Sequence, residues 1–323
     1  MQLRRTILLL LALTLIFSLL KFYFKHNKKA NKVNEATPIA WMGPEIEKDS
    51  TIQADEKEMI RYGQDLIAHT AKYLGPKGII SQTTNGMNCQ NCHLNAGKQA
   101  WGNNYGAVYA TYPKYRDRSG TIESIYKRVS DCMERSLNGK ALDSNSKEYR
   151  AIYAYIKYLG KEVAKGTKPL GAGIEKPGLL NRAADKSNGE TIYIAQCKIC
   201  HGEKGQGQLM ANKEEYVYPP LWGEHSYNDG AGLYRISNLA GYIKNNMPYL
   251  KSNHENPILT DEQSWDVAAF INTQPRPHMD QSKDWPNSKK KPFDYPFGPY
   301  ADNYTEAQHK FGPYTEMIKK SVK

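Results

Sequence analysis

The chain has 323 residues, enough for two domains, and its 23 tyrosines against 7 phenylalanines suit small domains better than one large apolar core. Its formal net charge of +11 favours anionic partners. No zinc-finger spacing or RNA-binding motif accompanies this charge, so we do not expect a nucleic acid among those partners.

Residues 1–24 are predicted to form a membrane-anchoring helix. Two arginines precede an apolar run from Ile7 to Phe24 that only Lys21 interrupts. At ~1.5 Å per residue, about 18 such residues just cross the hydrocarbon core of a bilayer. The alternative is a cleaved signal peptide, but no small-x-small cleavage site follows the run. Residues 25–54 are polar and charged, as expected of a tether.

Either interpretation of the N-terminus implies that the chain is exported. We expect it on the periplasmic side of the bacterial cytoplasmic membrane, held by its N-terminal helix, or soluble in the periplasm if that segment is cleaved. The membrane is therefore one expected partner.

A first domain is predicted over residues 55–165, around a heme-attachment motif. The stretch 55–75 has one apolar face and ends at a Gly-Pro pair, which indicates a helix before the motif. Cys89, Cys92 and His93 then follow the C-x-x-C-H spacing of a covalently attached c-type heme. In that arrangement the two thiols form thioethers with the porphyrin, and the histidine is the proximal iron ligand.

The remaining cysteine, Cys132, falls in a stretch that predicts a helix with Thr121 as its N-cap. At roughly 100° per residue, Cys132 lies between an apolar face and a basic edge. Arg128 and Arg135 lie to one side of it and Ser136 to the other. Two guanidiniums would favour a thiolate and could also hold an oxyanion. A buried structural cysteine beside solvated arginines is the alternative.

The second axial ligand of this first heme is left open between two neighbouring sulfur atoms. Met133 is the only methionine between the motif and the predicted helix that ends at Gly160, and it stands directly beside Cys132. Asn145 and Glu148 form the predicted capping pair of that later helix.

A linker is predicted over residues 166–178, which are rich in Gly, Pro and Lys and lack an apolar period. A second domain follows over residues 179–275, with a second C-x-x-C-H motif at Cys197, Cys200 and His201. Two such motifs in an exported chain predict two covalently attached hemes c. Zinc or thioredoxin-like chemistry fits less well, because neither explains a histidine after each cysteine pair.

Met247 is the predicted second ligand of the second heme, because a proline follows it and it precedes the last helix of the domain. Thioether ligation raises the reduction potential of a heme. Met210 and Met279 are the alternatives. The last helix is predicted to begin with a capping box of Thr260 and Gln263.

The predicted fold class is therefore mainly α, with two tandem cytochrome c-like domains behind an N-terminal membrane anchor helix. Residues 276–323 form a Pro- and Tyr-rich C-terminal extension. The segments "NCQNCHLNAG", "YPKYRDRSG", "RVSDCMERSLNG", "YVYPPLWG" and "NNMP" resemble the diheme thiosulfate dehydrogenases, relatives of the sulfur-oxidising cytochrome SoxA. The anchor, the tether and the end of the extension lie outside this resemblance.

The resemblance implies that His93 and Cys132 hold the first heme at the active site. It also implies that His201 and Met247 hold the second heme, which passes electrons on. In some relatives a lysine replaces this methionine on a change of redox state. The candidates for such a lysine here are Lys213 and Lys244.

The implied activity is that of an oxidoreductase acting on sulfur compounds, which joins two thiosulfates into tetrathionate or runs the reverse. Cys132 would bond covalently to thiosulfate, Arg128 and Arg135 would hold its sulfonate, and Ser136 would assist. A soluble cytochrome c or a membrane redox partner would accept the electrons. Two alternatives remain, namely a membrane-tethered diheme electron-transfer cytochrome without substrate chemistry and a SoxA-like sulfur-carrier subunit that needs a second protein.

Overall fold

The computed structural model describes residues 14–22 and 39–321. Residues 14–22 are helical and belong to an N-terminal unit, whereas the chain from Ala40 onward forms a second compact unit. The predicted anchor over residues 1–24 and the beginning of the tether lie mostly outside the described residues. Within the two described ranges, no helix has the length and the apolar character needed to cross a membrane.

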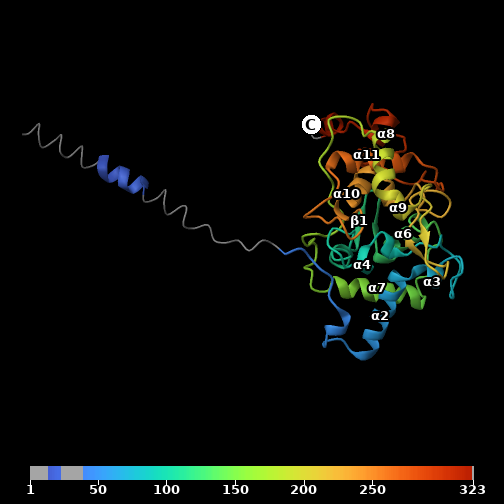
Figure 1. Cartoon of the computed structure of the whole chain (residues 1–323). Helices are drawn as coiled ribbons and strands as arrows, with labels where there is room; N and C mark the ends of the chain where they lie inside the picture. Colours follow the sequence, from blue (N-terminus) through green and yellow to red (C-terminus); the bar gives the residue numbers. More distant parts are fainter. Residues whose placement is uncertain (1–13, 23–38, 322–323) are drawn as a thin grey trace, which may run out of the picture. The chain divides into compact units, whose positions relative to one another are not determined.

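The compact unit is mainly helical, as predicted (Figure 1). Its longer helices are α2 (Ala54–Ala68), α6 (Ile125–Arg135), α7 (Lys147–Leu159), α8 (Lys186–Ile192), α10 (Ile236–Asn246), α11 (Asp261–Thr273) and α13 (Thr315–Ser321). The shorter ones are α3 (Thr70–Leu74), α4 (Leu94–Gly97), α5 (Val108–Thr111), α9 (Lys198–His201) and α12 (Glu306–Phe311). Strands β1 (Lys114–Arg116) and β2 (Thr121–Glu123) form one antiparallel hairpin, and β3 (Gln208–Leu209) and β4 (Tyr216–Tyr218) form another.

In the first half of this unit, α2 lies along α7 (Figure 1). Both helices bury an apolar face in one core cluster, to which α2 contributes Ile60 and α7 contributes Ile152. Gly63 permits the close crossing of the two helices, because a Cβ at this position would lie 2.0 Å from the main-chain oxygen of Ala151. A glycine on α2 thus sets how closely the helix before the first motif approaches the helix after it.

The second half repeats this arrangement with α8 and α11 (Figure 1). Here Gly189 of α8 faces the main-chain oxygen of Asp266, and an added Cβ would again lie 2.0 Å from that oxygen. Each C-x-x-C-H motif therefore has the same kind of helix pair around it, one helix before the motif and one after. Such a repeat is what two tandem helical domains predict.

Helix α7 begins one residue later than predicted. Ser146, not Asn145, is the N-cap of α7, and its hydroxyl accepts a hydrogen bond from the N–H of Tyr149. At the start of α11 the predicted capping box is confirmed, since Thr260 and Gln263 exchange both hydrogen bonds.

The helix that holds Cys132 also begins later than the sequence predicts. Thr121 lies in β2, opposite Arg116 of β1, and is therefore not the helix cap. Ser124 takes that role, and its hydroxyl accepts a hydrogen bond from the first turn of α6. The predicted helix over 55–75 is interrupted at His69, whose ψ of 42° leaves the helical region and separates α2 from α3.

The C-terminal extension is part of the compact unit. Asp284 forms an ion pair with Arg135 of α6, in the first half. Asp294 forms one with Arg235, the residue before α10, in the second half. The extension thus contacts both halves of the unit, through buried carboxylates in each case.

Candidate active site

The histidine of each C-x-x-C-H motif faces a main-chain carbonyl. Nδ1 of His93 lies 2.5 Å from the oxygen of Asn103, and Nδ1 of His201 lies 2.8 Å from the oxygen of Pro219. A carbonyl oxygen only accepts, so Nδ1 carries the proton in both rings and Nε2 keeps a free lone pair. Burial lowers the pKa of His93 to about 4 and also lowers the pKa of His201. Both imidazole rings are therefore neutral, and the Nε2 atom of each is available to bind a metal.

The cysteines of the two motifs are partly buried, and none of them forms a disulfide among the described residues. Burial raises the pKa of Cys89 to about 11, and it raises the pKa of Cys92 and of Cys197 to about 12. Cys89, Cys92 and Val129 of α6 pack against one apolar cluster that contains Met133 and Leu137, so the helix that carries Cys132 lies against the first motif. Two thiols and an imidazole with a free Nε2 fit the donor set of a covalently attached c-type heme.

Arg128 and Cys132 lie four residues apart on α6, and therefore on the same side of that helix. The interaction with Cys132 is the largest influence on Arg128 and raises the pKa of the guanidinium above its usual range, although burial alone would lower it. The neighbouring sulfur, that of Met133, is buried in an apolar cluster with Leu74 and Leu137.

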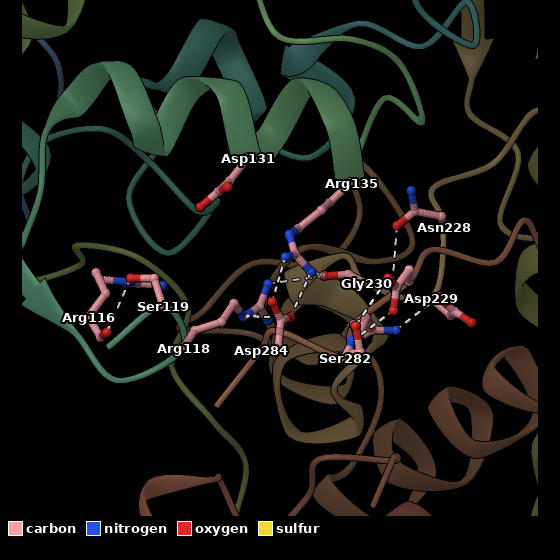
Figure 2. Close-up of polar contacts among 12 residues, drawn as sticks. Arg116, Arg118, Ser119, Asp131, Arg135, Asn228, Asp229, Gly230, Ser282 and Asp284 are labelled. Carbon is pink, nitrogen blue, oxygen red and sulfur yellow. Dashed lines mark hydrogen bonds and ion pairs between the residues drawn. The ribbon is translucent and has the colours of Figure 1, made fainter. Parts of the chain in front are cut away.

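Arg135 is paired with the C-terminal extension. Its Nη1 and Nη2 each donate to a carboxylate oxygen of Asp284 at 2.8 Å, and Nη1 also lies 3.3 Å from the oxygen of Gly230 (Figure 2). A substrate oxyanion would have to compete with Asp284 for these donors. Ser136 caps the C-terminal end of α6, and its N–H donates to the oxygen of Cys132 at 2.9 Å. It therefore stays on the same turn as the cysteine.

Arg118 joins these cations from the loop between β1 and β2. Its Nη1 donates to the oxygen of Gly230 at 3.1 Å, and its Nε lies 3.9 Å from Oδ2 of Asp284 (Figure 2). Burial and the charges of Arg135 and Arg128 lower the pKa of Arg118. Arg118 and Arg135 share both Asp284 and the oxygen of Gly230, so these two guanidiniums lie close together. Arg118 is not among the predicted site residues. The sequence feature that could have identified Arg118 is its position in the segment "YPKYRDRSG", one of the segments that carry the family resemblance.

Met247 ends α10 beside the second motif. Its side chain and that of Cys197 both pack against the apolar cluster that contains Tyr193. The alternative methionines lie elsewhere. Met210 directly follows β3, and Met279 lies in the C-terminal extension.

The two lysines considered as competing ligands differ in their surroundings. Lys244 forms an ion pair with Asp261 of α11, at 2.5 Å, whereas Lys213 is exposed. Ligation by Lys244 would therefore require this ion pair to break.

Comparison with known proteins places both halves of the compact unit in families. The SoxA/TsdA cytochrome c domain matches residues 80–164, and the cytochrome c domain matches residues 187–275. The thiosulfate dehydrogenase of Psychrobacter arcticus is 36% identical over 243 residues, which cover 74% of this chain and 70% of that protein. The chain belongs to the thiosulfate dehydrogenase family. A relative of the same name from Stutzerimonas stutzeri is 34% identical, with 76% of each chain covered.

A solved structure supports the same family. It is the thiosulfate dehydrogenase TsdBA of Marichromatium purpuratum in its as-isolated form, which superposes with a TM-score of 0.67 at 31% identity. The match covers 74% of this chain and 50% of the other, so this chain spans half the length of that protein.

Membership of the thiosulfate dehydrogenase family confirms the resemblance, the enzyme class and the tandem cytochrome c domains predicted from the sequence. It also confirms two covalently bound c-type hemes. The residues that fit them are Cys89, Cys92 and His93 in one half, and Cys197, Cys200 and His201 in the other. Both domain matches end before residue 276, so the C-terminal extension lies beyond them.

Proposed function

We propose that this protein oxidises thiosulfate to tetrathionate, or runs the reverse reaction, at Cys132. The position of Cys132 and Arg128 on α6, the helix that packs against the first heme-attachment motif, carries the proposal. The name shared by its curated relatives, thiosulfate dehydrogenase, supports the choice of substrate. In this proposal His93 and Cys132 would hold the iron of the first heme, and His201 and Met247 would hold that of the second.

Electrostatic repulsion is the main obstacle to joining two thiosulfates. Each is a dianion, and buried cations lower the cost of bringing two of them together. Arg128 is suited to this task, because a planar guanidinium matches sulfonate oxygens and this residue lies one helical turn from the reacting sulfur. Arg135 contributes its charge while its terminal nitrogens bind Asp284. Ser136 assists from the last turn of α6.

The chemistry needs one nucleophilic sulfur and a two-electron acceptor. The Cys132 thiolate forms a bond to the outer sulfur of a first thiosulfate, and two electrons leave the new sulfur pair. A second thiosulfate attacks that outer sulfur, and the Cys132 thiolate departs, as in thiol–disulfide exchange. The product is tetrathionate, the thiolate is regenerated, and no proton is consumed. When bound, the two hemes supply the electron acceptors, one electron each.

The two domains divide this work between them. We assign residues 55–165 to the catalytic domain, residues 179–275 to the electron-transfer domain and residues 166–178 to the linker between them. The second domain passes electrons to a soluble cytochrome c or to a membrane redox partner. The N-terminal residues 1–24 anchor the protein to the periplasmic side of the bacterial cytoplasmic membrane.

Steady-state thiosulfate oxidation with an artificial electron acceptor tests the proposal. We expect Cys132→Ala to keep both hemes attached and to lose activity by roughly a thousandfold or more. Met133→Leu is the matched control, because it removes the neighbouring sulfur and preserves the buried volume.

Each other outcome identifies a different function. Equal rates for wild type and Cys132→Ala would exclude the covalent role of the cysteine. No rate in either protein, with both hemes present, would favour the electron-transfer cytochrome without substrate chemistry. Activity that appears only when a second protein is added would favour the SoxA-like carrier subunit.

A further inference from the structure

A single carboxylate of the C-terminal extension reaches two of the arginines near Cys132. Asp284 accepts two hydrogen bonds of 2.8 Å from Arg135, and its Oδ2 lies 3.9 Å from Nε of Arg118 (Figure 2). The hydroxyl of Tyr295 donates to the same Oδ2 at 3.3 Å. The side chains of Asp284 and both arginines are only 10% to 12% exposed. One buried carboxylate therefore serves two buried guanidiniums.

Neighbours of Asp284 fix Arg118 at both its side chain and its main chain. The oxygen of Gly230 accepts from Arg118 at 3.1 Å and from Arg135 at 3.3 Å. The N–H of Trp285 donates to the main-chain oxygen of Arg118 at 2.7 Å, and the guanidinium of Arg118 lies 5.8 Å from the centre of the Trp285 indole. The extension thus contacts Arg118 at its main-chain oxygen through Trp285 and at its guanidinium through Asp284 and Trp285.

The positions of these arginines depend on a counter-charge. Arg118 is repelled by Arg135, which binds the same carboxylate, and also by Arg128. Removing the only carboxylate paired with Arg118 or Arg135 among the described residues would leave buried cations uncompensated. The guanidiniums of Arg118 and Arg135 would then move apart.

We propose that Asp284 is a positioning residue of the substrate site, which keeps Arg118 beside Arg135, three residues from Cys132 on α6, and so maintains the binding of the anionic substrate. The inference rests on the proposed function. It gives the C-terminal extension, which lies outside both matched domains, a part in the active site. The expected effect of removing Asp284 on substrate binding is opposite in sign to that of removing a negative charge alone. If Asp284 acted only as a negative charge near the site, its removal would strengthen the binding of a dianion.

Kinetics and calorimetry of Asp284→Asn test this inference. We expect KM for thiosulfate to rise roughly tenfold while kcat changes by less than about threefold, because substrate binding suffers and the reacting sulfur does not. Titration calorimetry of thiosulfate into the fully reduced diheme protein, without an electron acceptor, reports binding apart from turnover. Its dissociation constant should rise by a similar factor, roughly tenfold.

Asp294→Asn is the matched control, because it removes another buried carboxylate of the extension, which pairs with Arg235 rather than with Arg118. Both variants should lower the temperature of unfolding, but only Asp284→Asn should raise KM. If Asp284→Asn does not fold, Asp284→Glu replaces it under the same criterion, since it keeps the charge and displaces the carboxylate by one methylene.

An unchanged or lowered KM in a folded Asp284 variant would overturn the inference and leave the proposed function standing. A raised KM in Asp294→Asn would overturn it as well, because the effect would then be general to the extension. A wild-type protein that does not oxidise thiosulfate would instead remove the proposed function on which the inference rests.

Discussion

The hydroxyl of Tyr242, on α10 in the second half of the compact unit, donates a hydrogen bond of 3.0 Å to the main-chain oxygen of Asn91. Asn91 lies between the two cysteines of the first heme-attachment motif. One turn further along α10, the amide of Asn246 donates to the oxygen of Trp101 at 3.1 Å. The helix that ends at Met247 is therefore bonded to the first motif and to the loop that follows it.

Replacing Tyr242 by Phe is expected to lower the free energy of unfolding by about 1–2 kcal/mol, because a buried carbonyl loses its donor. Guanidinium denaturation of the diheme protein, followed by far-UV circular dichroism, measures this change. Tyr249→Phe is the control, since the side chain of Tyr249 is 42% exposed. Equal stability of the two variants would show that the bond to Asn91 contributes nothing.

Arg128 is expected to be more sensitive to substitution than any exposed arginine of the same domain. Arg128→Gln should lower kcat/KM for thiosulfate by roughly a hundredfold, because the guanidinium one turn from Cys132 is lost. Arg128→Lys should recover only part of this loss, since an ammonium cannot bind a sulfonate with two parallel hydrogen bonds. Arg150→Gln, at an exposed position of α7, should leave the kinetics unchanged.

Met247→Ala should leave the second heme attached and lower its reduction potential, because thioether ligation raises that potential. A spectroscopic redox titration measures the two potentials separately. Met210→Ala and Met279→Ala are the comparisons, and each should leave both potentials as in the wild type. A lowered second potential in either of these variants, with Met247→Ala unchanged, would reassign the ligand.

Stability in acid is expected to depend on Asp266 of α11. Burial would raise the pKa of this carboxyl, but hydrogen bonds from Arg182, Asn188 and the N–H of Asp185 outweigh burial and lower it. Because the folded pKa lies below the unfolded value, the ionised carboxylate stabilises the protein above about pH 4 and loses this effect as the pH falls through the folded pKa.

Asp266→Asn should therefore destabilise the protein at neutral pH and make its stability fall less steeply in acid. Urea denaturation across the acid range compares the variant with the wild type. Glu190→Gln, at an exposed position of α8, should follow the wild-type curve. A parallel fall for Asp266→Asn and the wild type would mean that other carboxyl groups govern acid unfolding.

Helix ends show how far local sequence signals reach. Thr260 caps α11 as predicted, because a capping box needs only residues three positions apart. Threonine is a common helix cap, but Thr121 lies in β2, where it pairs with Arg116 of β1. The pairing of two strands is not visible in the spacing that predicts a helix.

The sequence by itself determined the heme-attachment cysteines, the proximal histidines, the family and the mainly helical fold. These follow from fixed spacings and from the helical period, both of which are local properties of the chain. The sequence also placed Cys132 and Arg128 one turn apart on a single helix, and the structure has both residues on α6.

Only the tertiary structure decided which partner each arginine has. Arg135 meets Asp284 across 149 positions of the chain, and Arg118 meets the same carboxylate from another loop. The sequence alone predicted Arg135 as a free ligand of substrate, because no local pattern indicates a counter-ion so far away. Charge pairing acts through space, whereas spacing along the chain reports only on neighbours within an element.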